Sequence, residues 1–189
     1  MSTLDRKPYH HGDLRSELLR VADGLIDEDE AGAFSLREVA RRAGVTAPAA
    51  YRHFPDKEAL LAALAKKGFD DFAVALKGTQ ADAGDALAVI GQTYVRFAVA
   101  RPGRFRLMYG RAIADRSKYP ELESARLASV NALREAIAVT PQTAVANPAV
   151  TSLKLWCMVH GLSQLILDGM LAGHDVDTLA RAVTSGQIS

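Results

Sequence analysis

The segment of residues 35–57 constrains the fold more than any other part of the chain. Ser35 can cap a helix, and Glu38, three positions later, completes the pattern of a capping box. Apolar residues follow at helical spacing until Gly44, which can adopt the left-handed conformation that ends a helix. A second short helix is expected at about 46–53. Two short helices joined by a glycine turn are typical of the helix-turn-helix that reads DNA.

The same segment is locally basic. It holds five basic and two acidic residues, a local charge of +3, whereas the net charge of the whole chain is +1. A basic patch on a nearly neutral protein is typical of a small DNA-reading module. The alternative is an ordinary helical hairpin within a bundle, but the cap, turn, aromatic and lysine signals agree on the DNA-binding interpretation.

The composition indicates an all-α protein. Hydrophobic residues make up 49% of the 189 positions, which is ample for the core of one large or two small domains. Alanine is abundant, and the alternation of β-branched residues that marks strands is absent. The single cysteine, Cys157, excludes an internal disulfide and a cysteine-based zinc site, and it fits a reducing cytoplasm.

No stretch of the sequence is expected to export the chain or to hold it in a membrane. The N-terminus is charged from Asp5 to Lys7 and lacks an apolar region, so it does not resemble a signal peptide. The most apolar stretch, Leu153 to Leu171, includes Lys154 and Asp168, and we expect it to be too polar to span a bilayer. The sequence therefore favours a cytoplasmic protein without a membrane partner.

The helix-turn-helix segment resembles the TetR family of transcriptional regulators. The matching residues are Ala43-Gly44-Val45-Thr46, Tyr51-Arg52-His53-Phe54, Asp56-Lys57-Glu58 and Leu60. A weaker match, formed by Trp156, His160 and Gly161, resembles a subgroup with a Trp-His-Gly type C-terminal domain. The resemblance implies an N-terminal three-helix head that binds DNA and a C-terminal helical domain that binds a ligand and dimerises.

Three parts are expected along the chain: a flexible basic arm at 1–12, a helix-turn-helix DNA-binding domain at 13–58, and an effector-binding and dimerisation domain at 59–189. Arg6 and Lys7 of the arm can lie in a minor groove, or the arm is a plain tail. Helices are expected at 13–29, 56–78, 85–101, 103–109, 119–140, 148–173 and 175–185. The helix at 56–78 is long enough to leave the head and enter the next domain, which makes it the mechanical link between the two.

Nine residues of the head are expected to contact DNA: Ser35, Arg37, Thr46, Ala47, Ala49, Tyr51, Arg52, His53 and Lys57. By its position and by the resemblance, Arg37 is the candidate for a bidentate guanine contact, and Arg52 is the alternative if it points outward. The short side chains of the recognition helix can touch thymine methyl groups. The resemblance implies phosphate contacts for Tyr51 and His53, for which core packing is the alternative. Lys57 is expected in the first turn of its helix, where a DNA phosphate would offset its repulsion from the helix dipole.

The C-terminal half offers an apolar and aromatic set for a ligand pocket: Tyr94, Phe97, Phe105, Met108, Tyr109, Trp156 and His160. This character favours a small hydrophobic or aromatic effector, although plain core packing is the alternative for any one of them. The helix at 148–173 is apolar on two faces, and both need to be buried. The sequence leaves open which face meets a second subunit, and the residues assigned to the homodimer interface are Leu155, Val159, Leu162 and Ile166.

A dimeric transcription factor is the function that the sequence favours. In this family it is usually a repressor released by a small molecule, and its two-fold symmetry matches a palindromic operator in double-stranded DNA. An architectural DNA-binding protein without an effector is the first alternative. An enzyme that uses the C-terminal pocket is the second, and it is disfavoured because no catalytic triad spacing, phosphate loop, metal cluster or carboxylate pair stands out. No cofactor is expected, and no metal site either, since His10 and His11 lack a third ligand.

Overall fold

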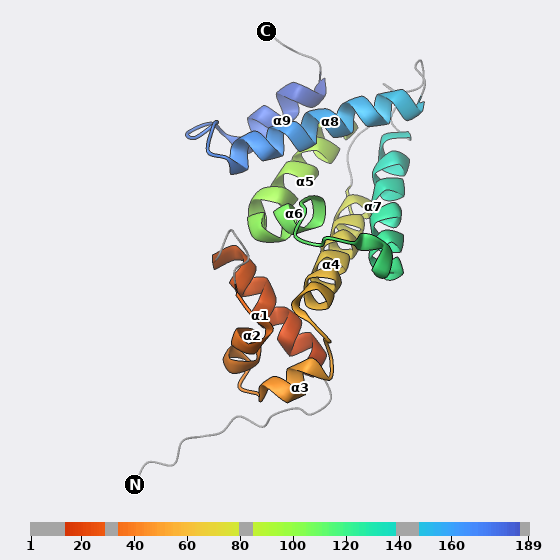
Figure 1. Cartoon of the computed structure of the whole chain (residues 1–189). Helices are drawn as coiled ribbons and strands as arrows, with labels where there is room; N and C mark the ends of the chain where they lie inside the picture. The colour runs from red at the N-terminus through yellow and green to blue at the C-terminus, as the bar shows by residue number, and fades with distance from the viewer. Residues whose placement is uncertain (1–13, 29–33, 80–84, 139–147, 186–189) are drawn as a thin grey trace.

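The computed structural model describes residues 14–28, 34–79, 85–138 and 148–185. Within these ranges the chain is all-α, as the sequence predicts. The helices are α1 (Leu14–Glu28), α2 (Leu36–Arg42), α3 (Ala47–Tyr51), α4 (Lys57–Lys77), α5 (Ala86–Ala100), α6 (Pro102–Tyr109), the short 3-10 helix η1 (Arg116–Lys118), α7 (Pro120–Ala138), α8 (Pro148–Leu167) and α9 (Val176–Ser185). Helices α1 to α3 form a head at one end of the molecule, and α5 to α9 form a body beyond it (Figure 1). The arm expected at 1–12 lies outside the described residues.

Local signals set the turns of the head. The Ser35 hydroxyl accepts a hydrogen bond from the Glu38 N–H at 3.2 Å, which confirms the predicted cap of α2. The Glu38 carboxylate accepts from the guanidinium groups of Arg41 and Arg42 rather than closing a capping box. Gly44 has a φ of 70°, the left-handed conformation expected between α2 and α3.

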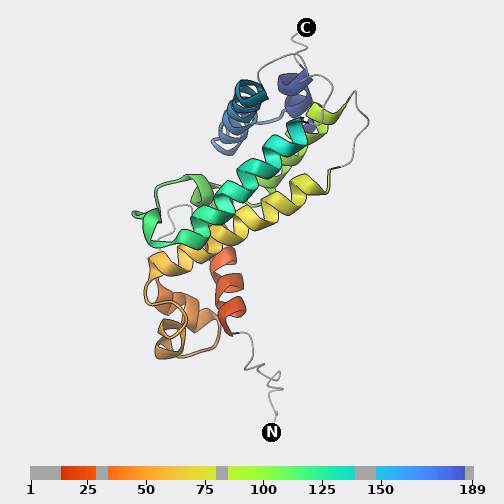
Figure 2. The ribbon, with the colours of Figure 1, turned by 90° about the vertical axis from the view of Figure 1, so that its right-hand side faces the viewer.

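Helix α4 connects the head to the body. The Asp56 carboxylate caps it by accepting a hydrogen bond from the Ala59 N–H at 2.7 Å. Its 21 residues bury apolar side chains along the whole length, from Leu60 near the head to Leu76 at the far end. In the body α4 lies beside α7, and the two helices run together away from the head (Figure 2). The long helix expected from the sequence therefore spans both regions.

In the body, α5 packs against α8 and α9, and α8 lies across the end of the molecule opposite the head (Figure 1). Helix α8 ends at Leu167, several residues before the predicted end at 173. Gly169 has a φ of 74°, and its N–H donates to the Ile166 carbonyl at 3.0 Å. The Met170 N–H donates to the Leu165 carbonyl at 3.0 Å. These bonds form a Schellman motif, so a glycine cap ends the helix although the apolar pattern continues past it.

The head meets the body at α6, which packs on α1 and α4. The buried Arg104 guanidinium donates to the Asp23 carboxylate of α1, with 2.8 Å between Nε and Oδ1, and to the Asp71 carboxylate of α4 at 2.7 Å. Gly103 approaches α1 so closely that a Cβ atom there would lie 2.2 Å from the Ile26 carbonyl oxygen. Only glycine fits such a contact with backbone. Three helices are therefore joined at this point by a buried ion-pair network and a close backbone approach.

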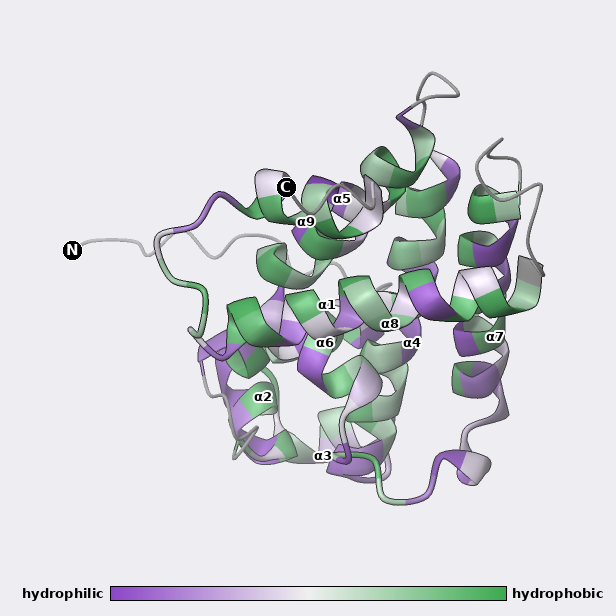
Figure 3. Ribbon diagram, turned by 90° about the horizontal axis from the view of Figure 1, so that it is seen from above, coloured by the Kyte–Doolittle hydropathy of each residue, from purple (hydrophilic) through white to green (hydrophobic). Residues whose placement is uncertain are grey.

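Helix α8 carries an exposed apolar surface, which we call the α8 stripe and which consists of Val150, Leu153, Cys157, Met158 and Leu165. Figure 3 shows the hydrophobic character of this helix as it crosses the molecule. Val159 and Leu162, which the sequence assigned to the dimer interface, are only 3% and 6% exposed because they pack inside this chain. Leu155 and Ile166 are half-buried against the same core. The surface open to a partner is therefore the opposite face of the helix from the one expected.

The segment Ala149–Leu167, among the described helices, is long and apolar enough by length and composition to cross a membrane. This differs from the expectation for 153–171, because the apolar segment ends before Asp168 and includes Lys154 as its only lysine, arginine or carboxylate. Its buried face packs on α5, α7 and α9, but only 22% of the segment is buried among the described residues.

Candidate nucleic-acid interface

Most of the predicted DNA contacts lie at exposed positions at the starts of α2 and α3 and just after α3. The exposed members of the set are Ser35, Arg37, Thr46, Tyr51, Arg52 and His53. Tyr51 is 42% exposed, so core packing, the alternative for this side chain, does not describe it. Thr46 occupies the cap position of α3 without a side-chain cap bond, and its hydroxyl is therefore available to a ligand.

Ala49 has little exposed surface. It is 9% exposed, and its neighbour Ala50 is fully buried in the core of the head. Helix α3 has five residues, little more than one turn, and one side of that turn packs inward. The predicted contact of Ala49 with a thymine methyl group therefore depends on a small exposed surface, and the half-buried Ala47 and the exposed Thr46 offer more.

The arginines of α2 fall into two groups. Arg41 lies 2.7 Å from the Glu38 carboxylate, and Arg42 lies 2.7 Å from the Glu28 carboxylate of α1. Hydrogen bonds from Arg41 and then Arg42 lower the pKa of Glu38 to about 2. Arg41 and Arg42 thus tie α2 to itself and to α1. Arg37 is exposed and has no ion pair within the described part of the chain, so its guanidinium can reach a base edge.

Two cations of the head, one on α1 and one at the start of α4, lie on aromatic rings. The Lys57 ammonium lies 4.9 Å from the centroid of the Phe34 ring, and the Arg15 guanidinium lies 5.1 Å from that of Phe54. Phe54 is 2% exposed and belongs to the core of the head. A phosphate held at this helix start would meet the amides of the first turn together with Lys57.

The residues predicted to bind an effector come together in the body as a packed aromatic cluster. Tyr94, Phe105 and Met108 are 0%, 2% and 1% exposed. The His160 ring lies 4.8 Å from the Tyr109 ring and 5.4 Å from the Phe105 ring, measured between centroids. The remaining members, Phe97 and Trp156, are half-buried against the same core. Core packing, the alternative for these residues, therefore describes the most buried of them.

A chain of hydrogen bonds runs through this cluster. The Tyr94 hydroxyl accepts from the Trp156 Nε1–H at 3.1 Å and lies 3.0 Å from His160 Nδ1. Because the Tyr94 oxygen accepts from Trp156, its own proton can be donated to His160 Nδ1, which fits a neutral imidazole. Burial lowers the pKa of His160 and raises those of Tyr94 and Tyr109. Within the described ranges, this cluster included, no group of three or more metal-binding side chains is found.

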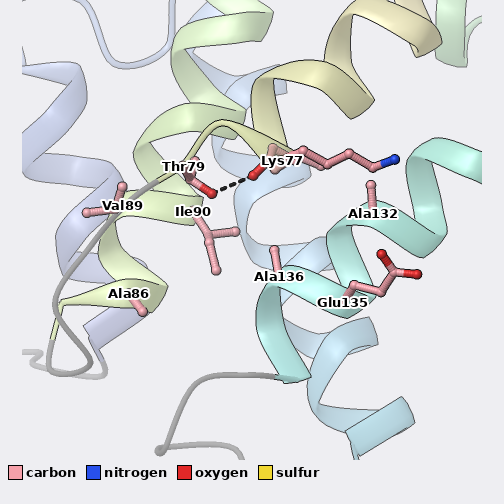
Figure 4. Close-up of a pocket in the computed structure, with 9 residues that line it drawn as sticks. Lys77, Thr79, Ala86, Val89, Ile90, Ala132, Glu135 and Ala136 are labelled. Atoms are coloured by element: carbon pink, nitrogen blue, oxygen red, sulfur yellow. Dashed lines mark hydrogen bonds between the residues drawn. The ribbon is translucent and has the colours of Figure 1, made fainter.

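A cleft of about 310 Å³, which we call the distal cleft, lies at the far end of α4. Its lining consists of Leu76, Lys77, Thr79, Ala86, Val89, Ile90, Ala132, Glu135 and Ala136 (Figure 4). None of the seven predicted effector residues belongs to it. Small alanine side chains on α5 and α7 leave this space, and alanines at facing helix positions are the sequence signal that would have indicated it. Lys77 and Glu135 contribute the charges of the lining.

Two family models match the chain. Residues 18–64 match the model of bacterial regulatory proteins of the tetR family. Residues 87–185 match the model of the Tetracyclin repressor-like C-terminal domain. No curated protein matches the chain. The two models together cover the helix-turn-helix of the head and almost the whole body.

Solved structures from several bacteria share the fold. A protein of unknown function from Rhodococcus sp. RHA1 is 31% identical, with a TM-score of 0.82 and 96% of each chain covered. A TetR transcriptional regulator from Rhodococcus sp. RHA1 is 22% identical, with a TM-score of 0.62 and coverage of 93% of this chain and 97% of that one. FadR from Bacillus subtilis, solved in complex with stearoyl-CoA, is 13% identical, with a TM-score of 0.70 and coverage of 92% and 99%.

Proposed function

Because the chain belongs to the TetR family of transcriptional regulators, we propose that it acts as a repressor that a small hydrophobic effector releases from a palindromic operator. It is a DNA-binding regulator with a helix-turn-helix head and a helical body. The observation that carries the proposed mode of DNA reading is the exposure of Arg37 in the first turn of α2, beside the exposed start of α3. Thr46 and Ala47 supply short contacts to bases, and Tyr51, His53 and Lys57 supply phosphate contacts.

A second copy of the chain is proposed to cover the α8 stripe. An exposed apolar surface along a whole helix is costly in water, and two copies related by a two-fold axis would bury it on both sides. The same symmetry gives two heads for two half-sites, whose centres lie about 34–36 Å apart when they occupy successive major grooves. Cys157 lies on this stripe, so a short thiol cross-linker should join two copies of the unmodified chain.

The effector is proposed to enter the distal cleft. Leu76 and Lys77 at the end of α4 line this cleft, and the other end of α4 lies in the head. An occupant can therefore tilt α4 and change the distance between the two recognition helices. Such an occupant has to bind the conformation that does not fit the operator more tightly, since otherwise no equilibrium shifts. Its apolar lining and the acyl-CoA bound by FadR from Bacillus subtilis support an effector with an apolar body.

The distal cleft also leads toward the aromatic cluster. Ile90 borders both the distal cleft and a void of about 10 Å³, which is bordered in turn by Trp156 and Val159. An effector that displaces the Ile90 side chain would reach Trp156 and, through the hydrogen bond to Tyr94, the rest of the predicted set. We propose on this basis that the aromatic cluster does not line the distal cleft. It would instead be reached when an effector bound there displaces Ile90.

The proposal assigns the chain to the cytoplasm, with no catalytic activity, no cofactor and no membrane partner. Trp156, His160 and Gly161 support membership of the subgroup with a Trp-His-Gly type C-terminal domain. The architectural alternative, a DNA-binding protein without an effector, would be favoured by a body without a cavity. The distal cleft is the observation that speaks against that alternative.

The test is selection of bound fragments from a random DNA pool by the purified protein at near-physiological salt. An enriched palindrome would support a dimeric, sequence-specific regulator and supply a probe for effector screening. Binding that only fades as salt rises, without enrichment, would contradict the proposal and favour the architectural alternative.

Two variants assign the contacts within the selected operator. Arg37→Ala should cost about 1–3 kcal/mol and relax one base position in each half-site. Arg41→Ala, whose side chain is engaged by Glu38, is the matched control and should leave base preference unchanged. Lys57→Ala should weaken all sequences about equally and reduce the slope of affinity against salt by about one unit.

A further inference from the structure

A second cleft lies where the head meets the body, on the side of α4 that faces η1 and the start of α7. We call it the junction cleft, and its volume is about 300 Å³. Figure 2 shows the chain around η1 beside the first turns of α4. The head contributes Arg15 of α1 and the His53–Phe54 pair, and the body contributes the segment Lys118–Leu122. This cleft shares no residue with the distal cleft at the other end of α4.

The hollow arises from small side chains. Ala59, Ala62 and Ala63 of α4 line it, opposite Tyr119 and Leu122. Helices α4 and α7 pack extensively on each other, and these alanines leave a gap where α7 begins. Phe54 closes the side of the cleft toward the head, and it is 2% exposed. Alanine, phenylalanine and tyrosine side chains therefore give the junction cleft an apolar lining that suits a flat or short apolar group.

The charges in the lining are mainly positive. Arg15, Lys66 and Lys118 line the cleft, and Glu121 is its one carboxylate. The Arg15 guanidinium lies against the Phe54 ring, 5.1 Å from its centroid, so a cation stands directly beside the apolar wall. Lys66 pairs with a carboxylate on its own helix at 2.8 Å, and Lys118 lies 3.8 Å from Asp115. Such exposed pairs contribute little energy and can be exchanged for a bound anion.

We propose that the junction cleft binds a small aromatic carboxylate, with its ring among the alanines and its carboxylate toward Arg15 and Lys118. The occupant would contact α1, the turn before α4, α4 itself and the start of α7 at the same time. It would therefore act on the angle between head and body directly. His53 lines this cleft and is also a proposed phosphate contact, so an occupied cleft and a bound operator compete for the same side chain.

The binding test is isothermal titration calorimetry of the full-length protein with 1-naphthoate, and with neutral 1-naphthamide as the matched ligand. We expect 1-naphthoate to bind and 1-naphthamide to bind at least about tenfold more weakly, because the amide lacks the charge that the cations recognise. Equal binding of the two ligands, or no binding of 1-naphthoate, would overturn the proposal.

Variants locate the site. Ala63→Leu fills the junction cleft and should reduce 1-naphthoate affinity at least about tenfold, whereas Ala136→Leu fills the distal cleft and should leave it unchanged. Lys118→Gln, at an exposed position where we expect no effect on folding, should weaken binding several-fold. Binding that persists in Ala63→Leu and Lys118→Gln, or that disappears in Ala136→Leu, would place the ligand elsewhere. Should Ala63→Leu fail to fold, Lys118→Gln decides.

The effect on DNA is measured separately. With the operator fragment, 1-naphthoate should weaken binding by the wild-type protein and leave Ala63→Leu unaffected. An equal effect of 1-naphthoate on both proteins would contradict coupling through the junction cleft. The calorimetry needs no DNA, so a failure to bind 1-naphthoate leaves the proposed regulator intact, and a failure to enrich an operator leaves the ligand site intact.

Discussion

The two sides of the junction between head and body are built differently. On the α6 side, Arg104 is buried among carboxylates of α1 and α4, and Gly103 touches the backbone of α1. On the α7 side, alanines of α4 leave the junction cleft open. We expect the head to pivot about the fixed side, so a ligand on the open side would change the angle between head and body at the smaller energetic cost.

The largest expected effect comes from breaking the fixed side. Arg104→Ala removes the buried cation from the Asp23 carboxylate and leaves it only the longer contact from the exposed Arg101. Removing the main partner of a buried ion pair costs about 3–5 kcal/mol. The free energy of unfolding in urea measures it. Arg101→Ala is the control, because Arg101 is 50% exposed and its contacts to Asp23 and Asp27 are 3.3 and 3.4 Å long. If Arg104→Ala lowers the free energy of unfolding no more than Arg101→Ala does, the ion-pair network is not what holds α6 to α1 and α4.

This network is also the part of the fold that sequence analysis did not predict. Arg104 lies 81 residues from Asp23 and 33 from Asp71, and nothing near it in the sequence distinguishes it from a surface arginine. The turns of the head were predictable because their signals are local: Ser35 caps its own helix, and Gly44 ends it. Contacts between distant segments depend on how helices pack, which a single sequence does not specify.

The same reasoning explains where the candidate site was predicted and where it was not. Exposure of Arg37 and Tyr51 agrees with the DNA-binding set, whereas the orientation of a five-residue helix, which buries Ala49, was beyond the periodicity of so short a segment. Tyr94, Trp156 and His160 lie together because aromatic residues gather in a core, and their role in binding an effector stays a prediction. The distal cleft was not predicted, because much of its lining is alanine, a side chain without a functional group that would mark a binding site.

A second way to break the fixed side is steric. Gly103→Ala would bring a Cβ atom to 2.2 Å from a backbone oxygen, which cannot move without shifting α1. Gly68→Ala is the matched control, because its Cβ atom would meet the flexible end of Met108 at 2.6 Å. Overpacking should cost about 1–3 kcal/mol at Gly103 and less at Gly68, by thermal or urea unfolding. Equal losses of stability in the two variants would mean that α6 and α1 can move apart, so that this side of the joint is not fixed.

A smaller effect on stability is expected from protonation of His160, whose ring packs against α6. Burial holds the pKa of His160 below its ordinary value of 6.5, and its ring lies against Phe105 and Tyr109 of α6. At a pH above 6.5 the imidazole is neutral in both states and its contribution is fully present. As the pH falls below that value the unfolded chain takes up the proton first, so stability declines. Melting temperatures from about pH 8 to about pH 5 should fall more steeply for the wild type than for His160→Gln. Parallel curves for the two proteins would show that His160 does not cause the loss of stability at low pH.

The smallest effect is expected on the open side. Ala63→Leu adds apolar volume to a cleft that already exists, so its free energy of unfolding should stay within about 0.5 kcal/mol of the wild type. Urea unfolding beside Gly103→Ala makes the contrast direct, since both variants enlarge a small residue at the same joint. A loss as large as that at Gly103 would show that the α7 side is as tightly packed as the α6 side.

The α8 stripe has a consequence for how stable the folded chain can be. If two copies bury this surface, the association adds to the free energy of folding by mass action. The melting temperature would then rise with protein concentration, and dilution alone would weaken the fold. In a cell, the number of copies would set both the occupancy of the operator and the lifetime of the protein, because isolated chains expose Leu153 and Met158 to proteases and to aggregation.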